Sequence, residues 1–163
     1  MNATYPGLQW IQRDTYVRKL EKRYAEGMLL RDDRAVFGSF LVSGLTQPHR
    51  FAIYTNRVLE AEGDEVGSGW EMGTISAGAR FKVLDICRRP GRTQITLLHL
   101  PEDGWELFAD VSTNVDESLI GYSRQKFDLA LTMKPLPALL DEQWRRLCSH
   151  AIGMTDFGQI SLE

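Results

Sequence analysis

Apolar and polar residues alternate through two consecutive runs within residues 78–107. In GARFKVLDI, Phe81 and Val83 alternate with Lys82 and Leu84, and TQITLLHL repeats the pattern after the basic turn CRRPGR. This period of two predicts a pair of consecutive β-strands. Because both runs carry apolar side chains on two faces near their ends, we expect a sheet that is covered on both sides or strongly curved.

Helical periodicity occurs near both ends of the chain. Asp14 can cap an N-terminal helix. The apolar stripe of this helix would be Val17, Leu20, Tyr24 and Met28. A second helix is predicted from Pro137, a residue favoured in the first helical turn. Its apolar stripe would be Leu140, Trp144, Leu147 and Ala151.

Further strands are predicted on either side of the alternating runs. Residues 35–44 and 50–62 have strand-like composition, with a turn between them, and we expect them to form a hairpin. The glycine-rich stretch that begins at Gly63 and ends at Gly78 predicts a long loop, unless residues 70–75 add a short strand. Trp10 and Ile11 are assigned to the core because large apolar residues mostly serve packing.

The segments after residue 105 are harder to assign. ELFADV predicts a strand at 106–111, and DFGQISL predicts a terminal one. Residues 114–133 fit two patterns. One is a continuous helix, and the other is a short helix or turn followed by a strand at 126–133. We favour the second.

Together these elements predict an α+β fold in a single domain, residues 1–163. We expect a curved, mostly antiparallel sheet of about five to seven strands, with the N-terminal and late helices packed on it. Hydrophobic residues make up 43% and charged residues 25% of the chain, values of an ordinary globular protein, so disorder is not favoured.

Charge and motif content exclude several function classes. The net charge of -3 argues against binding of duplex nucleic acid over the whole surface. No apolar run approaches the roughly 20 residues of a membrane span, and no export signal is visible, so we expect a cytoplasmic protein without a membrane partner. The two cysteines and three scattered histidines form no metal-binding motif, and we expect neither a metal nor another cofactor.

The order of the charges is more unusual than their sum. The basic turn with Arg88, Arg89 and Arg92 lies between acidic blocks at residues 60–72 and 102–117. One interpretation is that these blocks are solvated strand edges and loops that prevent pairing with another chain. The other is that they form a recognition patch, in which the three arginines could also hold a phosphate.

One motif resembles a known enzyme family. Glu71 is followed, after a loop, by Gly78, Phe81 and Val83. The pattern resembles the end of the mono-ADP-ribosyltransferase core, where a catalytic glutamate precedes a Gly-x-x-Phe-x-Val strand. The resemblance implies that Glu71 is the catalytic carboxylate. It also implies that Arg34, and Ser39 or Ser43, are counterparts of the family's upstream arginine and serine.

Our main functional hypothesis is a non-catalytic module that binds another protein, such as an adaptor, a chaperone or a toxin-neutralising immunity protein. Its charged face would use Trp70 and Trp105 as anchors beside the basic turn, because tryptophan often anchors interfaces.

The alternative hypothesis is a small-ligand-binding protein or an enzyme that acts on an anionic or nucleotide substrate and resembles the ADP-ribosyltransferases. It would use the loop from Gly63 to Gly78, with Glu71 as acid or base and Arg80 or Arg88 neutralising the ligand. A third hypothesis, binding of single-stranded nucleic acid, would use Phe81, Trp105 or Phe108 for stacking, but the acidic flanks disfavour it.

Overall fold

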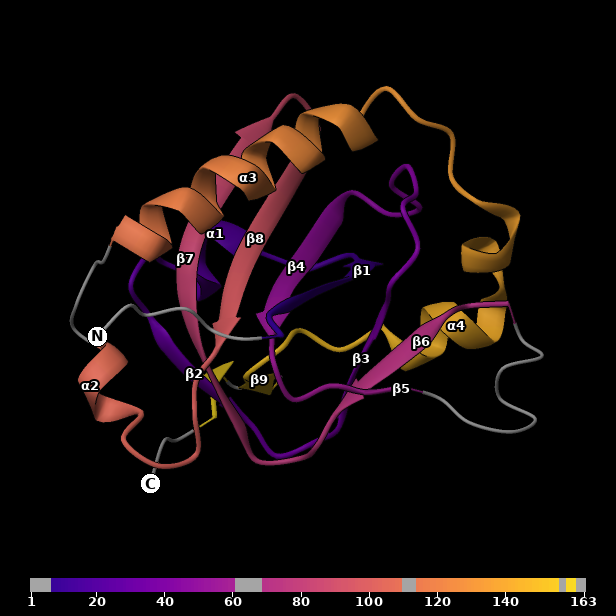
Figure 1. Ribbon diagram of the computed structural model, residues 1–163. Coiled ribbons are helices and arrows are strands. Elements are labelled where there is room, and N and C mark those ends of the chain that lie inside the picture. The colour runs from indigo at the N-terminus through magenta and orange to yellow at the C-terminus, as the bar shows by residue number, and fades with distance from the viewer. Residues whose placement is uncertain (1–6, 61–68, 110–113, 156–157, 161–163) are drawn as a thin grey trace.

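The computed structural model describes residues 7–60, 69–109, 114–155 and 158–160. Its main feature is an eight-stranded sheet with the strand order β2-β7-β8-β4-β1-β3-β6-β5 (Figure 1). The α+β class is confirmed. The strands of the sheet are β1 (Gln9–Thr15), β2 (Leu29–Asp32), β3 (Val36–Ser39), β4 (His49–Thr55), β5 (Leu59–Glu60), β6 (Met72–Ile75), β7 (Ala79–Arg89) and β8 (Arg92–His99).

The helices are short apart from one. They are α1 (Leu20–Arg23), α2 (Glu106–Ala109), α3 (Asn114–Ala130), the 3-10 turn η2 (Pro137–Leu140) and α4 (Glu142–Leu147). The end of the described chain adds a small two-stranded sheet of β9 (Met154–Thr155) and β10 (Gly158–Gln159), where we expected one terminal strand.

The predicted N-terminal helix is reduced to the single turn of α1. Asp14 does not cap it, because this residue lies in β1, where its carboxylate accepts a hydrogen bond of 2.6 Å from Arg50 on β4. Lys19, directly before α1, has a φ of 57°, so the backbone leaves the right-handed helical region there. Val17, Leu20 and Tyr24 are nevertheless buried in the core, as their apolar spacing suggested.

The predicted hairpin of residues 35–44 and 50–62 is wrong. β1 lies between β3 and β4, pairing antiparallel with both, and β4 continues the sheet through a parallel pairing with β8. Asp14 and Arg50 are opposite each other in the β1–β4 register and are only 8% and 2% exposed. A buried ion pair left half-formed is costly, so this contact favours the β1–β4 pairing over a local hairpin.

The β7–β8 hairpin is confirmed. Its two strands pair antiparallel from Phe81 opposite His99 to Arg89 opposite Arg92, with an irregularity between Val83 and Asp85. The expected coverage on two sides is also present. Phe81 and Val83 contribute to the main apolar core, whereas α3 packs over β7 and β8 on the other face (Figure 1).

The strands predicted at 106–111 and 126–133 are wrong, because α2 and the 17-residue helix α3 occupy these segments. A strand would have placed Phe127, Leu129 and Leu131 on one face. In the helix, Phe127 is fully buried together with Ala130, whereas Leu129 is 58% exposed. The short strand considered for residues 70–75 is present as β6.

A pair of glycine substitutions tests this packing. A Cβ added at Gly44 would overlap the backbone carbonyl of Met133, just beyond α3, whereas one added at Gly121 on the exposed side of α3 meets nothing within 4 Å. We expect Gly44→Ala to lower the free energy of unfolding by about 1–3 kcal/mol. Gly121→Ala should raise it by up to about 1 kcal/mol, because alanine favours the helix. Urea unfolding measures both, and equal stability of the two variants would contradict the packing of residue 44 against Met133.

Candidate functional site

A cavity of about 330 Å³ lies on the α3 side of the sheet. Strand β1 contributes Trp10 and Gln12, the segment after β3 contributes residues 40–43, and α3 contributes Tyr122, Gln125 and Lys126. The volume is within the range of small-molecule sites, which is roughly 300–1,000 Å³. The cavity is therefore large enough for a nucleoside-sized group.

The two helices α3 and α4 cover different parts of the sheet. α3 lies across β7 and β8, while α4 lies beside β6 (Figure 1). Trp144 of α4 packs with Trp70 and Leu41 in a separate apolar cluster. The cavity lies at the α3 side of this arrangement, where Trp10 and Gln12 of β1 meet Tyr122, Gln125 and Lys126 of α3.

The cavity wall combines a cation with aromatic rings. The Lys126 ammonium lies 4.5 Å from the ring centre of Trp10 and 5.1 Å from that of Tyr122. Burial lowers the pKa of Lys126. Arg50 also lines the cavity, but Asp14 binds it at 2.6 and 2.9 Å. Lys126 is therefore the cation best placed to attract an anionic ligand.

A row of three residues crosses the sheet next to the cavity. Gln12 on β1 is opposite Ser39 on β3, and Ser39 is opposite Met72 on β6, so the three side chains share one face. The Gln12 amide donates a hydrogen bond of 2.6 Å to the carbonyl of Leu41.

Ser39 connects this row to Glu71. Its hydroxyl donates a 2.6 Å hydrogen bond to the carbonyl of Trp70 and accepts one of 3.0 Å from the amide of Leu41, which lines the cavity. The Glu71 carbonyl accepts a 3.0 Å hydrogen bond from Phe40. The cavity wall and the Glu71 backbone are thus held together by consecutive hydrogen bonds.

Glu71 has an unusual backbone. Its φ is 47°, the left-handed region, and its side chain is exposed. A non-glycine residue in this region carries a cost of order 1 kcal/mol, and such residues concentrate at functional sites. Of the two serines proposed as its partner, Ser39 is the neighbour. Ser43 instead donates to the carbonyl of Gly44 and accepts from the amide of Leu136.

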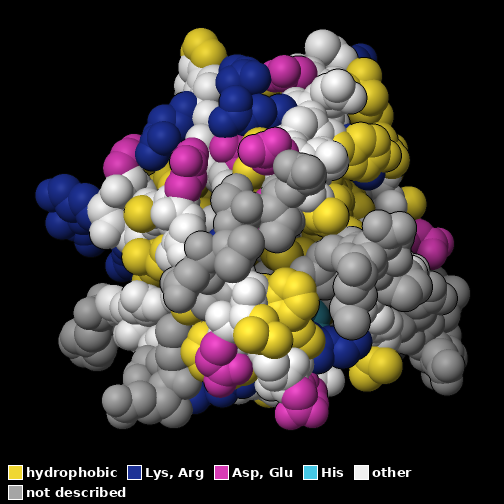
Figure 2. All heavy atoms as spheres, turned by 60° about the vertical axis from the view of Figure 1, so that its left-hand side comes forward, with side chains coloured by type: hydrophobic (Ala, Val, Ile, Leu, Met, Phe, Trp, Pro, Cys, Tyr) yellow, Lys and Arg dark blue, Asp and Glu magenta, His cyan; other side chains and the backbone are white. Residues whose placement is uncertain are grey.

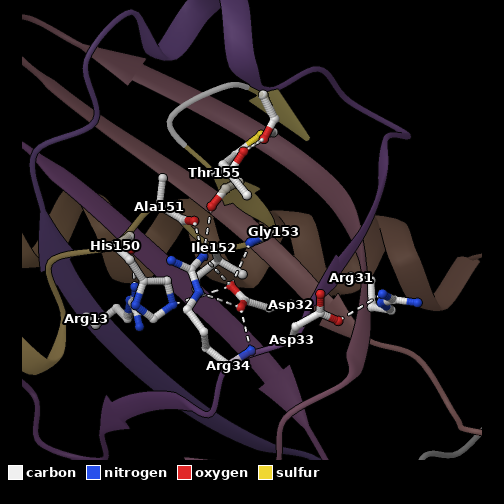
Figure 3. A network of polar contacts seen from close by, with 12 residues as sticks. Arg13, Arg31, Asp32, Asp33, Arg34, His150, Ala151, Ile152, Gly153 and Thr155 are labelled. Carbon is white, nitrogen blue, oxygen red and sulfur yellow. Dashed lines mark hydrogen bonds and ion pairs between the residues drawn. The ribbon is translucent and has the colours of Figure 1, made fainter. Parts of the chain in front are cut away.

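Arg34, the predicted upstream arginine, lies in a different network (Figure 3). Its guanidinium donates to both carboxylate oxygens of Asp32, at 2.9 and 3.2 Å, and to the carbonyls of Ala151 and Met154. Asp32 also accepts a 2.8 Å hydrogen bond from the amide of Gly153. Arg34 therefore holds the C-terminal segment and is not brought to Glu71.

The basic turn and Trp105 are not brought together. Arg89 is bound to Asp128 of α3 at 2.8 Å, and Arg92 donates to the carbonyl of Gln47, while Arg88 is exposed. Figure 2 shows basic and acidic side chains interleaved at the top of the molecule, where this turn and α3 lie. Trp105 packs against Arg80 at the opposite end of β7. Because this strand spans roughly 30 Å, Trp105 is far from the basic turn.

Trp70 and Trp105 are both half-buried. Trp70 packs on Trp144, with ring centres 5.4 Å apart, and the Arg80 guanidinium lies 4.9 Å from the centre of the Trp105 ring. Their role as anchors for a partner stays a prediction. The acidic block at 60–72 lies largely outside the described residues.

Sequence reasoning missed Lys126, Gln12 and Trp10 as cavity residues. Lys126 was placed at the start of a predicted strand, and Trp10 was assigned to the core. The signal for Lys126 was in the helical alternative for 114–133, because residues four apart such as Tyr122 and Lys126 lie on one face of a helix.

The sequence matches no protein-family model and no curated protein. The fold is similar to solved structures. Vis, an ADP-ribosyltransferase toxin from Vibrio splendidus, was solved with the M6 inhibitor and matches with 18% identity over 61% of this chain and 51% of that chain, at a TM-score of 0.50.

Two further structures match at lower scores. The type III effector XopAI from Xanthomonas axonopodis pv. citri has 13% identity over 61% of this chain and 48% of its own, with a TM-score of 0.46. Exoenzyme S from Pseudomonas aeruginosa, solved with human 14-3-3 protein beta and Carba-NAD, has 12% identity over 66% and 59%, with a TM-score of 0.47. The chain thus spans about half the length of the structures it matches.

The similarity to Vis shows that 61% of this chain shares its fold with part of an ADP-ribosyltransferase. It contradicts the interpretation as a non-catalytic protein-binding module and favours the alternative, a ligand-binding protein or enzyme. The geometry gives a physical reason, because the proposed binding face is not assembled: Trp105 and the basic turn lie at opposite ends of β7. Among the described helices, none is long and apolar enough to span a bilayer.

Asp32 provides a test of the Figure 3 network. Burial opposes its ionisation, but the contact with His150 at 3.3 Å and the hydrogen bonds from Arg34 and Gly153 outweigh this effect and hold the pKa of Asp32 well below its usual value. Because the folded pKa is the lower one, the ionised carboxylate stabilises the fold above the unfolded pKa of about 4, and this stabilisation is lost as the pH falls below it.

We expect Asp32→Asn to lower the free energy of unfolding at pH 7 by about 3 kcal/mol, because the neutral amide loses charge-assisted hydrogen bonds from Arg34 and from the amide of Gly153. The variant should also lose stability less steeply than the parent protein between pH values of about 4 and 2. The matched control is Asp33→Asn, whose side chain is 58% exposed, with an expected change below about 0.5 kcal/mol. Chemical unfolding across this pH range measures both, and equal effects at the two positions would contradict the buried network.

Proposed function

We propose that this protein is an ADP-ribosyltransferase-type enzyme that binds a nicotinamide dinucleotide at the α3 cavity and uses Glu71 as its carboxylate. The observation that carries the proposal is the hydrogen-bonded path from the cavity wall through Ser39 to the peptide between Trp70 and Glu71. The fold shared with Vis supports it, since Vis is an ADP-ribosyltransferase.

The chemistry of the cavity suits part of such a ligand. A cavity of about 330 Å³ can take one nucleoside portion, with the remainder of the dinucleotide extending outward. Trp10 offers an aromatic face, and Gln12 and Gln125 offer amides that can bind polar ring atoms. Lys126 supplies positive charge for a phosphate.

A carboxylate is the group that the reaction needs. In ADP-ribosyl transfer the bond between nicotinamide and ribose breaks, and its electron pair goes to the ring nitrogen. The ribose carbon develops positive charge before an acceptor nucleophile bonds to it and loses its proton. A carboxylate beside that carbon stabilises the charge, as in glycoside hydrolysis. Glu71 is the acidic residue that follows the peptide held by Ser39.

A substitution at Glu71 tests the catalytic role. We expect Glu71→Gln to lower the rate of nicotinamide release from NAD by at least about 100-fold while NAD affinity changes little, because the amide keeps the shape and loses the charge. Release is measured by chromatography and affinity by calorimetry. The control, Glu117→Gln at an exposed position on α3, should keep full activity. Unchanged activity of Glu71→Gln would sink the assignment.

A substitution at Lys126 tests the ligand site separately. Lys126→Met should weaken NAD binding about 10-fold, since it removes the charge held over Trp10, and Lys126→Arg should restore most of the affinity. Quenching of tryptophan fluorescence by NAD provides a second readout. If the parent protein shows neither NAD binding nor quenching, the dinucleotide proposal is wrong.

A further inference from the structure

A second, smaller cavity lies where β7 begins and β8 ends. Its volume is about 90 Å³, and it shares no lining residue with the α3 cavity. Arg57, Arg80 and His99 line it together with the chain at residues 76–79. Its size suits one small ion or functional group and excludes a nucleoside.

Both arginines have buried donors without a protein partner. The Nε atoms of Arg57 and Arg80 are buried, and neither has a hydrogen-bond partner among the described residues. Each guanidinium is nevertheless held in position. Arg57 donates through Nη2 to the carbonyl of Leu100, and Arg80 stacks on Trp105. The described residues thus satisfy only part of the donor capacity of the two guanidinium groups that line this cavity.

The charges around the cavity are mostly positive. His99 bonds to the Thr55 hydroxyl at 2.8 Å, and burial, with a smaller contribution from Arg57, lowers the pKa of His99 to about 3. Among the lining residues Glu102 is the one carboxylate, and its side chain is exposed. Two guanidinium charges therefore share a small space with no buried carboxylate among its lining residues.

We infer that this cavity binds a tetrahedral oxyanion, either free phosphate or the phosphate group of a monoester, with Arg57 and Arg80 as its donors. Guanidinium groups match the oxygens of phosphate, and such charge-assisted bonds are the strong ones. Glu102 at the mouth repels the anion and so limits its affinity. The proposal does not rest on the function assigned to the α3 cavity, because the residues differ.

Phosphate titration of the full chain at constant ionic strength tests the site. We expect a saturable rise in Tm, as for any ligand that binds the folded state. Arg80→Ala should weaken phosphate binding at least about 10-fold. Arg88→Ala, which removes an exposed arginine from the distant basic turn, should leave it unchanged. Loss of binding in Arg88→Ala alone would overturn the proposal and assign phosphate to the turn.

Glu102→Gln keeps the test decisive if Arg80→Ala does not fold, because residue 102 is exposed. Removal of the repelling charge should tighten phosphate binding about 3-fold, and unchanged or weaker binding would contradict the site. Methyl phosphate distinguishes a phosphate monoester from free phosphate as the ligand. If it binds as tightly as inorganic phosphate or more tightly, the ligand is a phosphorylated molecule. If only inorganic phosphate binds, the ligand is the free ion. Equal stabilisation by acetate or chloride would overturn the tetrahedral oxyanion.

Discussion

The buried carboxylate of Asp32 holds the C-terminal segment, residues 150–155, against the sheet, and much of the remaining packing depends on it. It stands at the end of β2 and is fully buried, and it receives hydrogen bonds from Arg34 and from the amide of Gly153, with His150 at 3.3 Å (Figure 3). Arg34 in turn binds two carbonyls of the same C-terminal segment. An ionised carboxylate is buried at low cost only when it is paired and hydrogen-bonded in this way. The charge on Asp32 therefore stabilises the packing of this segment on the sheet.

The same C-terminal segment also covers Arg13. Arg13 is 1% exposed, donates to the carbonyl of His150 and lies over the ring of Phe51. With this segment on one face of the sheet and α3 on the other, the strands are buried on both sides. The α3 cavity lies between α3 and the residues that follow β3, with Trp10 and Gln12 of β1 in its wall. The candidate site is thus formed by the same packing of α3 on the sheet that stabilises the fold.

The sequence could predict those elements that a local pattern of residues determines. The β7–β8 hairpin follows from alternation within one short segment. The order β4-β1-β3 depends instead on pairings such as Asp14 with Arg50, which no local pattern reveals. In the candidate site, the family resemblance left Ser39 and Ser43 as alternatives, and it is Ser39 that bonds to the carbonyl of Trp70, directly before Glu71. It could not show that Arg34 is held by Asp32, a contact that also requires the C-terminal segment.

Charge order along the chain was a poor guide to where charge is available. Two of the three arginines in the basic turn are engaged within the chain: Arg92 donates to the carbonyl of Gln47, and Arg89 forms a solvent-accessible pair with Asp128. Exposed pairs of this kind contribute little and serve mainly to keep the surface solvated. Lys126 and Arg80, by contrast, rest on tryptophan rings beside cavities. A cation that is partly desolvated on an aromatic face attracts an anion more strongly than a solvated one does, because fewer waters screen it. Two cations therefore lie on tryptophan rings beside cavities, whereas two of the three arginines in the basic turn bind other parts of the chain.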